Sequence, residues 1–183
     1  MNFIVNKWGK RILSIIFFLT IVFIIFGPVK FSFNVNIPFL YFNSTASVAK
    51  GVYLKVPARN FHDGDYIVYE PTAATTDLAF DRQWISNKNE CFIKQIGAIE
   101  GEHYKIDSDT LQFTVNGRYI GQVFPTDREG KSMPALRGDY TVPENEFLPV
   151  ADNPRSFDGR YTGTVPIKNI KAKVIPLITG FAW

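Results

Sequence analysis

The stretch LQFTVNGRYI, residues 111–120, alternates apolar and polar residues on both sides of an Asn-Gly pair. Alternation with a period of two is typical of a β-strand with one buried face. Asn116-Gly117 is a strong signal for a two-residue hairpin turn. This stretch therefore predicts two antiparallel strands joined by a tight turn.

The same alternation recurs through the rest of the chain after residue 30. Strand-like segments occupy residues 31–37, 51–57, 64–71, 91–99, 103–109 and 163–177. None of the remaining segments has a convincing helical period, although residues 72–90 could hold one short helix. Residues 125–143 are rich in glycine, proline and charge, which favours a surface excursion. We predict a mostly β domain, closed on a single core, with irregular insertions at about 72–90 and 125–143.

The N-terminal segment ILSIIFFLTIVFIIFGPV, residues 12–29, is almost wholly apolar and follows Lys7, Lys10 and Arg11. As a helix it would span about 27 Å, enough to cross the core of a bilayer. Positive charges before the segment predict that the N-terminus faces the cytoplasm. The sequence thus indicates a cytoplasmic basic tail and a single transmembrane anchor over residues 1–29, followed by an external domain over residues 30–183.

A cleaved signal peptide is the alternative reading of this segment, because it would share the basic start. Its apolar core would normally be shorter, and a small-x-small cleavage site should follow it. The residues that follow here, GPVKFSFNVN, are bulky. An uncleaved anchor is therefore favoured.

Composition excludes several classes of site. The 183 residues include 20 basic and 17 acidic side chains, a balance too even to favour nucleic acid as a partner. Cys91 is the single cysteine, which excludes an internal disulfide. His62 and His103 stand far apart without ligand-like spacing, so we expect no metal and no cofactor.

A hydroxyl-rich stretch, NSTASVAKGVY at residues 43–53, lies between two strand-like segments and has no period of its own. It is either a solvated linker or a loop that carries a nucleophile. A serine needs a base, and neither histidine has a recognisable setting for that role. The other known solution pairs serine with a lysine that burial keeps neutral.

Lys94, in the segment CFIKQIGAI, is the lysine that fits this requirement. On a strand it shares a face with Phe92 and Ile96, so it points with the apolar side chains. A lysine among core-facing positions costs stability unless it is paired or functional. The alternative is an edge-strand lysine whose amine reaches solvent. Further along, the polar segment DNPRSFDGRYTGTVP, residues 152–166, is by itself only a loop with a turn network.

Taken in order, these three segments resemble the type I signal peptidase family, and most closely its conjugative-transfer branch, the TraF-type maturation peptidases. The nucleophile box T-x-S-x-P-x-G-x-Y is similar to residues 45–53, TASVAKGVY. The lysine box K-R-V-x-x-x-x-G-D is similar to residues 94–102, KQIGAIEGE. The C-terminal box G-D-N-x-x-S-x-D-S-R-Y-x-G-x-V-P is similar to residues 151–166, ADNPRSFDGRYTGTVP.

This chain departs from those boxes at a few positions. Ala49 replaces the proline after the nucleophile, Gln95 replaces the arginine after the lysine, and Gly159 replaces a serine. A glycine is also replaced by Ala151, and the Gly-Asp turn reads Glu100-Gly101-Glu102. None of these changes removes a hydroxyl, amine or carboxylate that the chemistry uses.

The resemblance implies a role for each matched residue. Ser47 would be the nucleophile and Lys94 the general base. The backbone N–H of Ser47 and the hydroxyl of Thr45 would form the oxyanion hole.

The resemblance assigns supporting roles to the C-terminal box. Asp158, counted with the catalytic set, would fix Arg160 and the loop that carries Ser156, and Ser156 would help to hold the lysine. A purely structural ion pair is the alternative for Asp158.

At the level of function, the resemblance implies a membrane-anchored serine endopeptidase that processes a pilin precursor in a conjugative, type IV secretion system. The product would be either linear or cyclised. The enzyme would sit in the bacterial inner membrane with its catalytic domain in the periplasm. Its partners would be that membrane and a membrane-embedded pilin precursor or another leader-bearing protein.

Two alternatives remain open from the sequence. One is a general type I signal peptidase, and the other is a non-catalytic scaffold of the secretion complex, which Ala49 and Gln95 would favour. For an enzyme, we expect shallow pockets that admit small residues before the cut. We also expect an extended substrate to pair along a strand edge near residues 48–55.

Overall fold

The computed structural model describes residues 7–26, 39–134 and 136–180. The chain divides into two units, Met1–Ile37 and Pro38–Trp183. The strand predicted for residues 31–37 lies outside the described residues.

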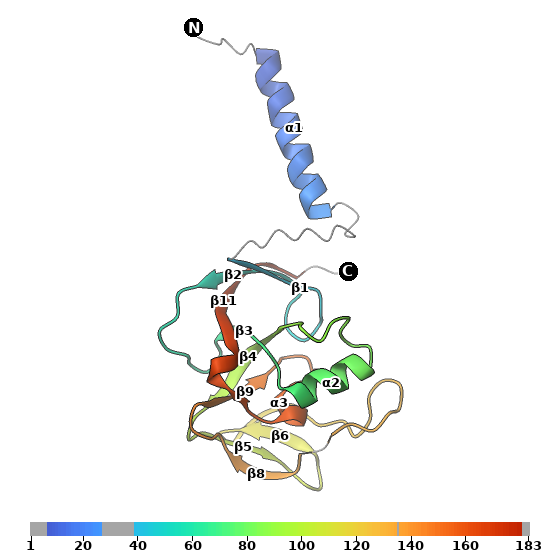
Figure 1. The fold of residues 1–183 in the computed structure, drawn as a ribbon, viewed down its shortest axis with the longest axis vertical. Helices are drawn as coiled ribbons and strands as arrows, with labels where there is room; N and C mark the ends of the chain where they lie inside the picture. The colour runs from blue at the N-terminus through green and yellow to red at the C-terminus, as the bar shows by residue number, and fades with distance from the viewer. Residues whose placement is uncertain (1–6, 27–38, 135, 181–183) are drawn as a thin grey trace. The chain divides into compact units, whose positions relative to one another are not determined.

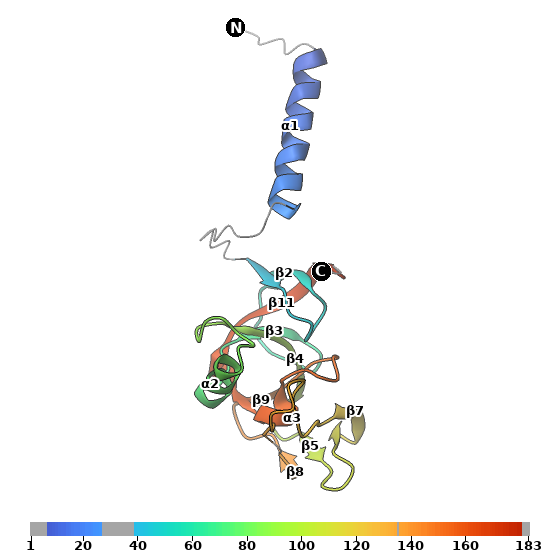
Figure 2. The ribbon, with the colours of Figure 1, turned by 90° about the vertical axis from the view of Figure 1, so that its right-hand side faces the viewer.

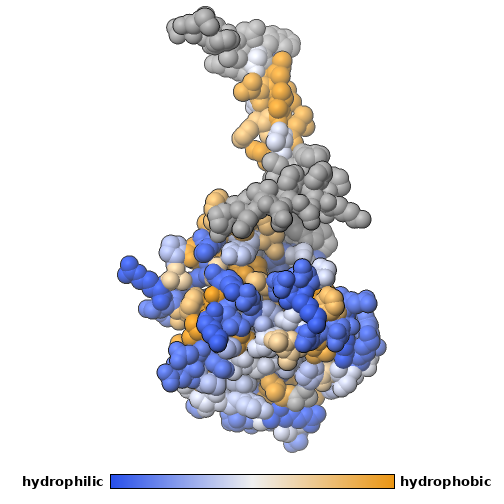
Figure 3. Space-filling view, viewed as in Figure 1, coloured by the Kyte–Doolittle hydropathy of each residue, from blue (hydrophilic) through white to orange (hydrophobic). Residues whose placement is uncertain are grey.

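The first unit contains one helix, α1 (Lys7–Phe26). The hydroxyl of Thr20 donates to the carbonyl oxygen of Ile16 at 2.8 Å, so this polar group is satisfied within the helix. Figure 3 shows apolar side chains along the visible face of this helix. Over the described residues, no helix combines the length and the apolar character that crossing a bilayer requires. The anchor over residues 12–29 therefore stays a prediction, and residues 27–29 lie outside the described part.

The second unit consists of two antiparallel sheets, which confirms the mostly β prediction (Figure 1). The larger sheet has the order β1-β2-β11-β3-β4-β9-β10. Its strands are β1 (Leu40–Asn43), β2 (Gly51–Val56), β3 (Tyr66–Tyr69), β4 (Phe92–Ile99), β9 (Glu146–Val150), β10 (Val165–Pro166) and β11 (Ile170–Thr179). The smaller sheet, in the order β7-β6-β5-β8, contains β5 (His103–Ile106), β6 (Gln112–Val115), β7 (Arg118–Gln122) and β8 (Gly138–Thr141).

The predicted hairpin at residues 111–120 is present as β6 and β7. Val115 pairs with Arg118, leaving a two-residue turn at Asn116 and Gly117. Both turn residues have positive φ, 48° and 74°, which is the conformation that the Asn-Gly pair tolerates best.

Two expectations about the body were wrong. The domain does not close on one core, because its buried apolar residues form three clusters. One joins residues of the small sheet with Ala98, Leu148 and Val150 of the large sheet, and two are formed mainly by the large sheet. Alternation shows which face of a strand is buried, but not which sheet it packs against. Nor is segment 125–143 entirely an excursion, since β8 pairs with β5 across residues 138–141.

Three helical segments complete the second unit (Figure 2). The short helix expected in residues 72–90 is confirmed as α2 (Ala73–Asp81), whose first turn is capped by the Thr72 hydroxyl. The segment read as a polar loop contains α3 (Gly159–Thr162), with Asp158 as its N-cap. A 3₁₀ turn, η1 (Ile167–Asn169), leads into β11.

The expected substrate edge near residues 48–55 was also wrong. Strand β2 is paired on both sides, with β1 through Tyr53 and Tyr41 and with β11 through Leu54 and Ile175. Its backbone groups are already used, so no peptide can add there. In the described part of the sheet, β1 and β10 are the two outer strands, and β1 ends where the hydroxyl-rich loop begins.

Candidate active site

The hydroxyl-rich loop is wound around the side chain of Asn43. This residue ends β1 and is only 6% exposed. Its amide nitrogen donates to three loop carbonyls, those of Thr45, Val48 and Ala49, at 3.0, 3.1 and 3.2 Å. Its amide oxygen accepts from the backbone N–H of Thr45 at 3.1 Å and from the Thr45 hydroxyl at 2.8 Å. The loop thus has a defined conformation, which a solvated linker would lack.

Further contacts fix the same loop from outside. The Tyr53 hydroxyl donates to the Ala49 carbonyl at 2.6 Å, and burial raises the pKa of Tyr53 to about 12, which keeps its proton in place. The side-chain amide of Asn153 donates to the Ala46 carbonyl at 2.9 Å. Gly51 closes the loop so tightly that a Cβ atom there would lie 2.1 Å from the Ile178 oxygen. Ser47, half-buried, is therefore held by a rigid frame.

Lys94 lies on β4, between β3 and β9, and is only 3% exposed. The prediction that it points inward with Ile96 is confirmed, and the solvent-reaching edge alternative was wrong. Its amine donates a hydrogen bond of 2.6 Å to the hydroxyl of Ser156. Burial lowers the pKa of Lys94 from 10.5 to about 8, although the nearby Asp158 carboxylate opposes this shift. At pH 7 about a tenth of the amine is therefore neutral, far more than in an ordinary lysine.

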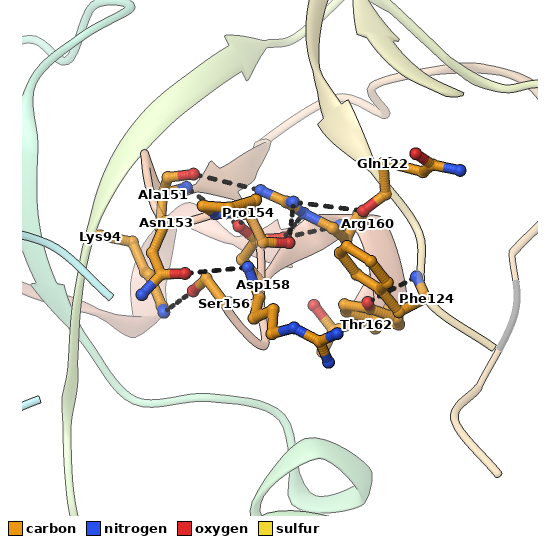
Figure 4. Close-up of polar contacts among 12 residues, drawn as sticks. Lys94, Gln122, Phe124, Ala151, Asn153, Pro154, Ser156, Asp158, Arg160 and Thr162 are labelled. Atoms are coloured by element: carbon orange, nitrogen blue, oxygen red, sulfur yellow. Dashed lines mark hydrogen bonds and ion pairs between the residues drawn. The ribbon is translucent and has the colours of Figure 1, made fainter. Parts of the chain in front are cut away.

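Asp158 and Arg160 form a fully buried ion pair beside this amine (Figure 4). The guanidinium donates to both carboxylate oxygens, from Nε at 2.8 Å and from the second terminal nitrogen at 3.0 Å. The backbone N–H of Ala151 adds a third donor at 3.0 Å. Burial raises the pKa of Asp158, and the Arg160 and Lys94 charges oppose that rise.

The same arginine ties down the loop that carries Ser156. Arg160 donates to the carbonyl oxygens of Ala151 at 3.1 Å and Pro154 at 2.9 Å, both of which precede Ser156. The Ser156 N–H donates to the Asn153 carbonyl at 3.0 Å. Both members of the ion pair thus contact the segment that carries Ser156, the serine to which Lys94 donates.

A cleft of about 560 Å³ brings the reactive groups together. It is lined by Ser47, Thr45, Lys94 and Ser156, among others, whereas Asp158 and Arg160 lie behind its wall. A hydroxyl and an amine of lowered pKa that face one cleft can perform acyl transfer without a histidine. Among the described residues, no group of histidine, cysteine and acidic side chains could hold a metal ion.

The structure shows an unexpected contact at Thr45. Its hydroxyl donates to Asn43, so it must rotate away from that partner before it can donate to a substrate oxygen. Sequence reasoning also missed Asn43, Tyr53 and Asn153 as the frame of the loop. An asparagine at the end of a strand, just before small residues, typically starts an Asx turn, and this signal could have identified Asn43.

One departure from the family pattern has a packing reason. Gly159 lies so close to β9 that a Cβ atom would approach Leu148 Cδ1 and the Pro149 oxygen to 2.6 Å each. The serine of the family box has no room at this position.

Comparison with known proteins identifies the family of the chain. The family model described as "Signal peptidase, peptidase S26" matches residues 5–178. The chain belongs to the signal peptidase family. This family is one of serine peptidases, so the resemblance seen in the three boxes is confirmed.

Two individual proteins are similar to this signal peptidase family member. The plasmid transfer protein TraF of Escherichia coli is 28% identical over 148 residues, which covers 75% of this chain and 81% of TraF. A crystal structure of a signal peptidase I from Enterococcus faecalis covers 64% of this chain and 98% of its own, with 17% identity and a TM-score of 0.39.

Proposed function

We propose that this chain is a membrane-anchored serine endopeptidase that uses Ser47 as nucleophile and Lys94 as general base. The observation that carries the proposal is the shared cleft. Ser47 is held there on a rigid loop, and Lys94 reaches it as a buried amine whose pKa is about 8. Burial disfavours the ammonium form and is the largest cause of this lowered pKa, to which the Arg160 charge adds.

The reaction proceeds through an acyl-enzyme. Ser47 Oγ attacks the scissile carbonyl carbon while Lys94 Nζ accepts the hydroxyl proton. The tetrahedral intermediate collapses, the peptide C–N bond breaks, and Lys94 returns the proton to the leaving amine. A water molecule, activated by the same amine, then hydrolyses the ester and restores Ser47.

The oxyanion of the intermediate needs donors at its developing charge. The backbone N–H of Ser47 is one proposed donor. The Thr45 hydroxyl is the second, once it rotates from Asn43 into the cleft.

Ser156, Asp158 and Arg160 act on Lys94 without touching the substrate. Ser156 Oγ fixes the amine position, and the ion pair fixes the loop of Ser156. The Asp158 charge raises the pKa of Lys94, and the Arg160 charge lowers it. The opposite charges of Asp158 and Arg160 largely cancel in their effect on Lys94. Burial of the amine is therefore the main cause of its lowered pKa.

The substrate proposed for this site is a leader-bearing precursor, and similarity to a plasmid transfer protein favours a pilin precursor of a conjugative system. The anchor over residues 12–29 would place the enzyme in the same inner membrane, with its catalytic unit in the periplasm. The substrate backbone would lie between the outer strand β1 and the first residues of β4, since Asn43, Phe92 and Lys94 all line the cleft. Attack on the acyl-enzyme by the substrate's own amine would give a cyclic product.

The test is precursor processing in membranes that carry wild type, Ser47→Ala or Lys94→Ala, read by intact mass. Loss of processing in both variants, with the proteins inserted and folded, supports the proposal. A product lighter than the linear chain by one water identifies cyclisation. Processing of general leader-bearing proteins, but not pilin, would indicate a general signal peptidase, and unchanged processing in both variants would indicate a scaffold.

A further inference from the structure

Part of the cleft has no role in the chemistry proposed above. Beyond Ser47 and Lys94, the cleft is lined by charged side chains, among them Glu90, Asp127 and Arg155, and by aromatic and other apolar side chains from several segments of the chain. This aromatic wall consists of Trp84, Phe92, Phe124, Met133, Phe157 and Tyr161.

Contacts between its members hold the aromatic wall in place. Trp84 packs edge-on against Phe157, with ring centroids 5.2 Å apart, and Phe157 lies 6.0 Å from Tyr161. The Tyr161 hydroxyl accepts from the backbone N–H of Phe124 at 2.9 Å. Trp84 follows α2, and its backbone N–H donates to the carbonyl of Ala79 near the end of this helix. The surface is therefore preformed, and binding a ligand would cost little free energy for ordering these side chains.

The partial exposure of the aromatic wall indicates a ligand-binding surface. Trp84 is 37% exposed, and the Phe157, Phe124 and Phe92 side chains are half-buried, although core packing could have covered them. The guanidinium carbon of Arg155 lies 4.5 Å from the Phe124 ring centroid, and that of Arg82 lies 5.9 Å from the Trp84 ring. Partly exposed rings in a cleft, beside polar groups, are characteristic of ligand sites. A cleft of about 560 Å³ is also much larger than an alanine side chain needs.

We propose that the aromatic wall is a specificity subsite that binds one large apolar side chain of the peptide substrate, close to the scissile bond. This proposal rests on the function proposed above in one respect, that the ligand is a peptide. Phenylalanine, leucine and methionine fit this subsite, because each buries apolar surface and phenylalanine adds edge-to-face ring contacts. Small residues would still be required at other positions of the substrate, so recognition combines a small and a large side chain.

The experiment separates binding from cleavage by using the full chain with Ser47→Ala. Calorimetry measures the dissociation constants of short alanine-based peptides that carry a single phenylalanine, moved one position at a time, with the all-alanine peptide as reference. Each series is repeated with Trp84→Ala and with Trp84→Phe. Phe80→Ala is the matched control, since Phe80 is a similarly exposed aromatic residue on α2 that does not line the cleft.

The proposal expects phenylalanine at one position, or at two adjacent positions, to tighten binding on the order of 10-fold. Trp84→Ala should abolish that preference, while Trp84→Phe and Phe80→Ala should keep it. An equal affinity for all peptides, or a preference that survives in a folded Trp84→Ala protein, would overturn the subsite. If the preference is present but wild type cleaves none of the peptides or precursors, the subsite stands and the peptidase proposal fails.

Discussion

Lys94 Nζ and Ser156 Oγ are joined by a hydrogen bond of 2.6 Å, and neither side chain is more than 3% exposed. The bond needs no charge on the lysine, because a neutral amine still has two hydrogens to donate. It fixes the direction of the amine while burial lowers the pKa of Lys94. Further along the chain, Asp158 and Arg160 contact the segment that carries Ser156.

The pH dependence of cleavage follows from the protonation of Lys94. The amine accepts a proton only in its neutral form, and its pKa is about 8. We therefore expect kcat/KM to rise with pH and to level off above about pH 8. Initial rates measured from pH 6 to pH 10 (roughly two pH units on either side of that pKa) check this. A rate that falls over this range would contradict the assignment of Lys94 as the base.

Stability should depend on pH through the same residue. The folded-state pKa of about 8 lies below the unfolded value of 10.5, so between these values the unfolded chain binds more protons. The free energy of unfolding should therefore increase as pH rises from 8 towards 10.5, by about 3 kcal/mol in all. Denaturant unfolding of wild type and Lys94→Met measures the effect as the difference between their pH slopes. Equal slopes would show that Lys94 is not desolvated in the folded protein.

The Asp158→Asn variant tests whether Asp158 influences the pKa of Lys94 or only stabilises the fold. Removing one partner of a buried ion pair costs about 3 kcal/mol or more, so the thermal midpoint should fall. The Asp158 charge raises the pKa of Lys94, and its loss should therefore shift the acidic limb of the kcat/KM profile to lower pH. A purely structural pair would lower stability and leave that limb in place.

Asn43→Ala should disable the nucleophile loop. Three loop carbonyls lose their common donor, which costs about 1–3 kcal/mol of stability. Because the reacting serine then shifts, kcat should fall on the order of 10²-fold with little change in KM. Asn169→Ala is the control, since the amide of Asn169 donates to one backbone carbonyl, that of Glu70, outside the cleft. Full activity of a folded Asn43→Ala protein would mean that Asn43 does not position Ser47.

The sequence predicted those parts of the fold that local pattern decides. Alternation and the Asn116-Gly117 turn identified the hairpin of β6 and β7, because a two-residue turn fixes its own register. The burial of Lys94 followed from its position on a strand face. The pairing of β11 between β2 and β3 could not be read in this way, since strand order depends on contacts between distant segments.

At the candidate site, box resemblance identified the side chains but not their environment. The hydrogen bonds around Asn43 form because the loop folds back onto this side chain, which lies before the matched box. The crowding at Gly159 depends on the approach of α3 to β9, which no local pattern encodes. Thr45 matched its box, yet only the structure shows that its hydroxyl is engaged by Asn43.

The most direct test of the central claim is to trap the acyl-enzyme. The full chain is mixed with its precursor substrate, quenched in acid at early times and digested, and the peptide that contains Ser47 is weighed. We predict a mass increment on Ser47 equal to the acyl portion of the substrate, absent in both Ser47→Ala and Lys94→Ala. An increment on another residue, or processing that continues in Ser47→Ala, would contradict the Ser–Lys mechanism.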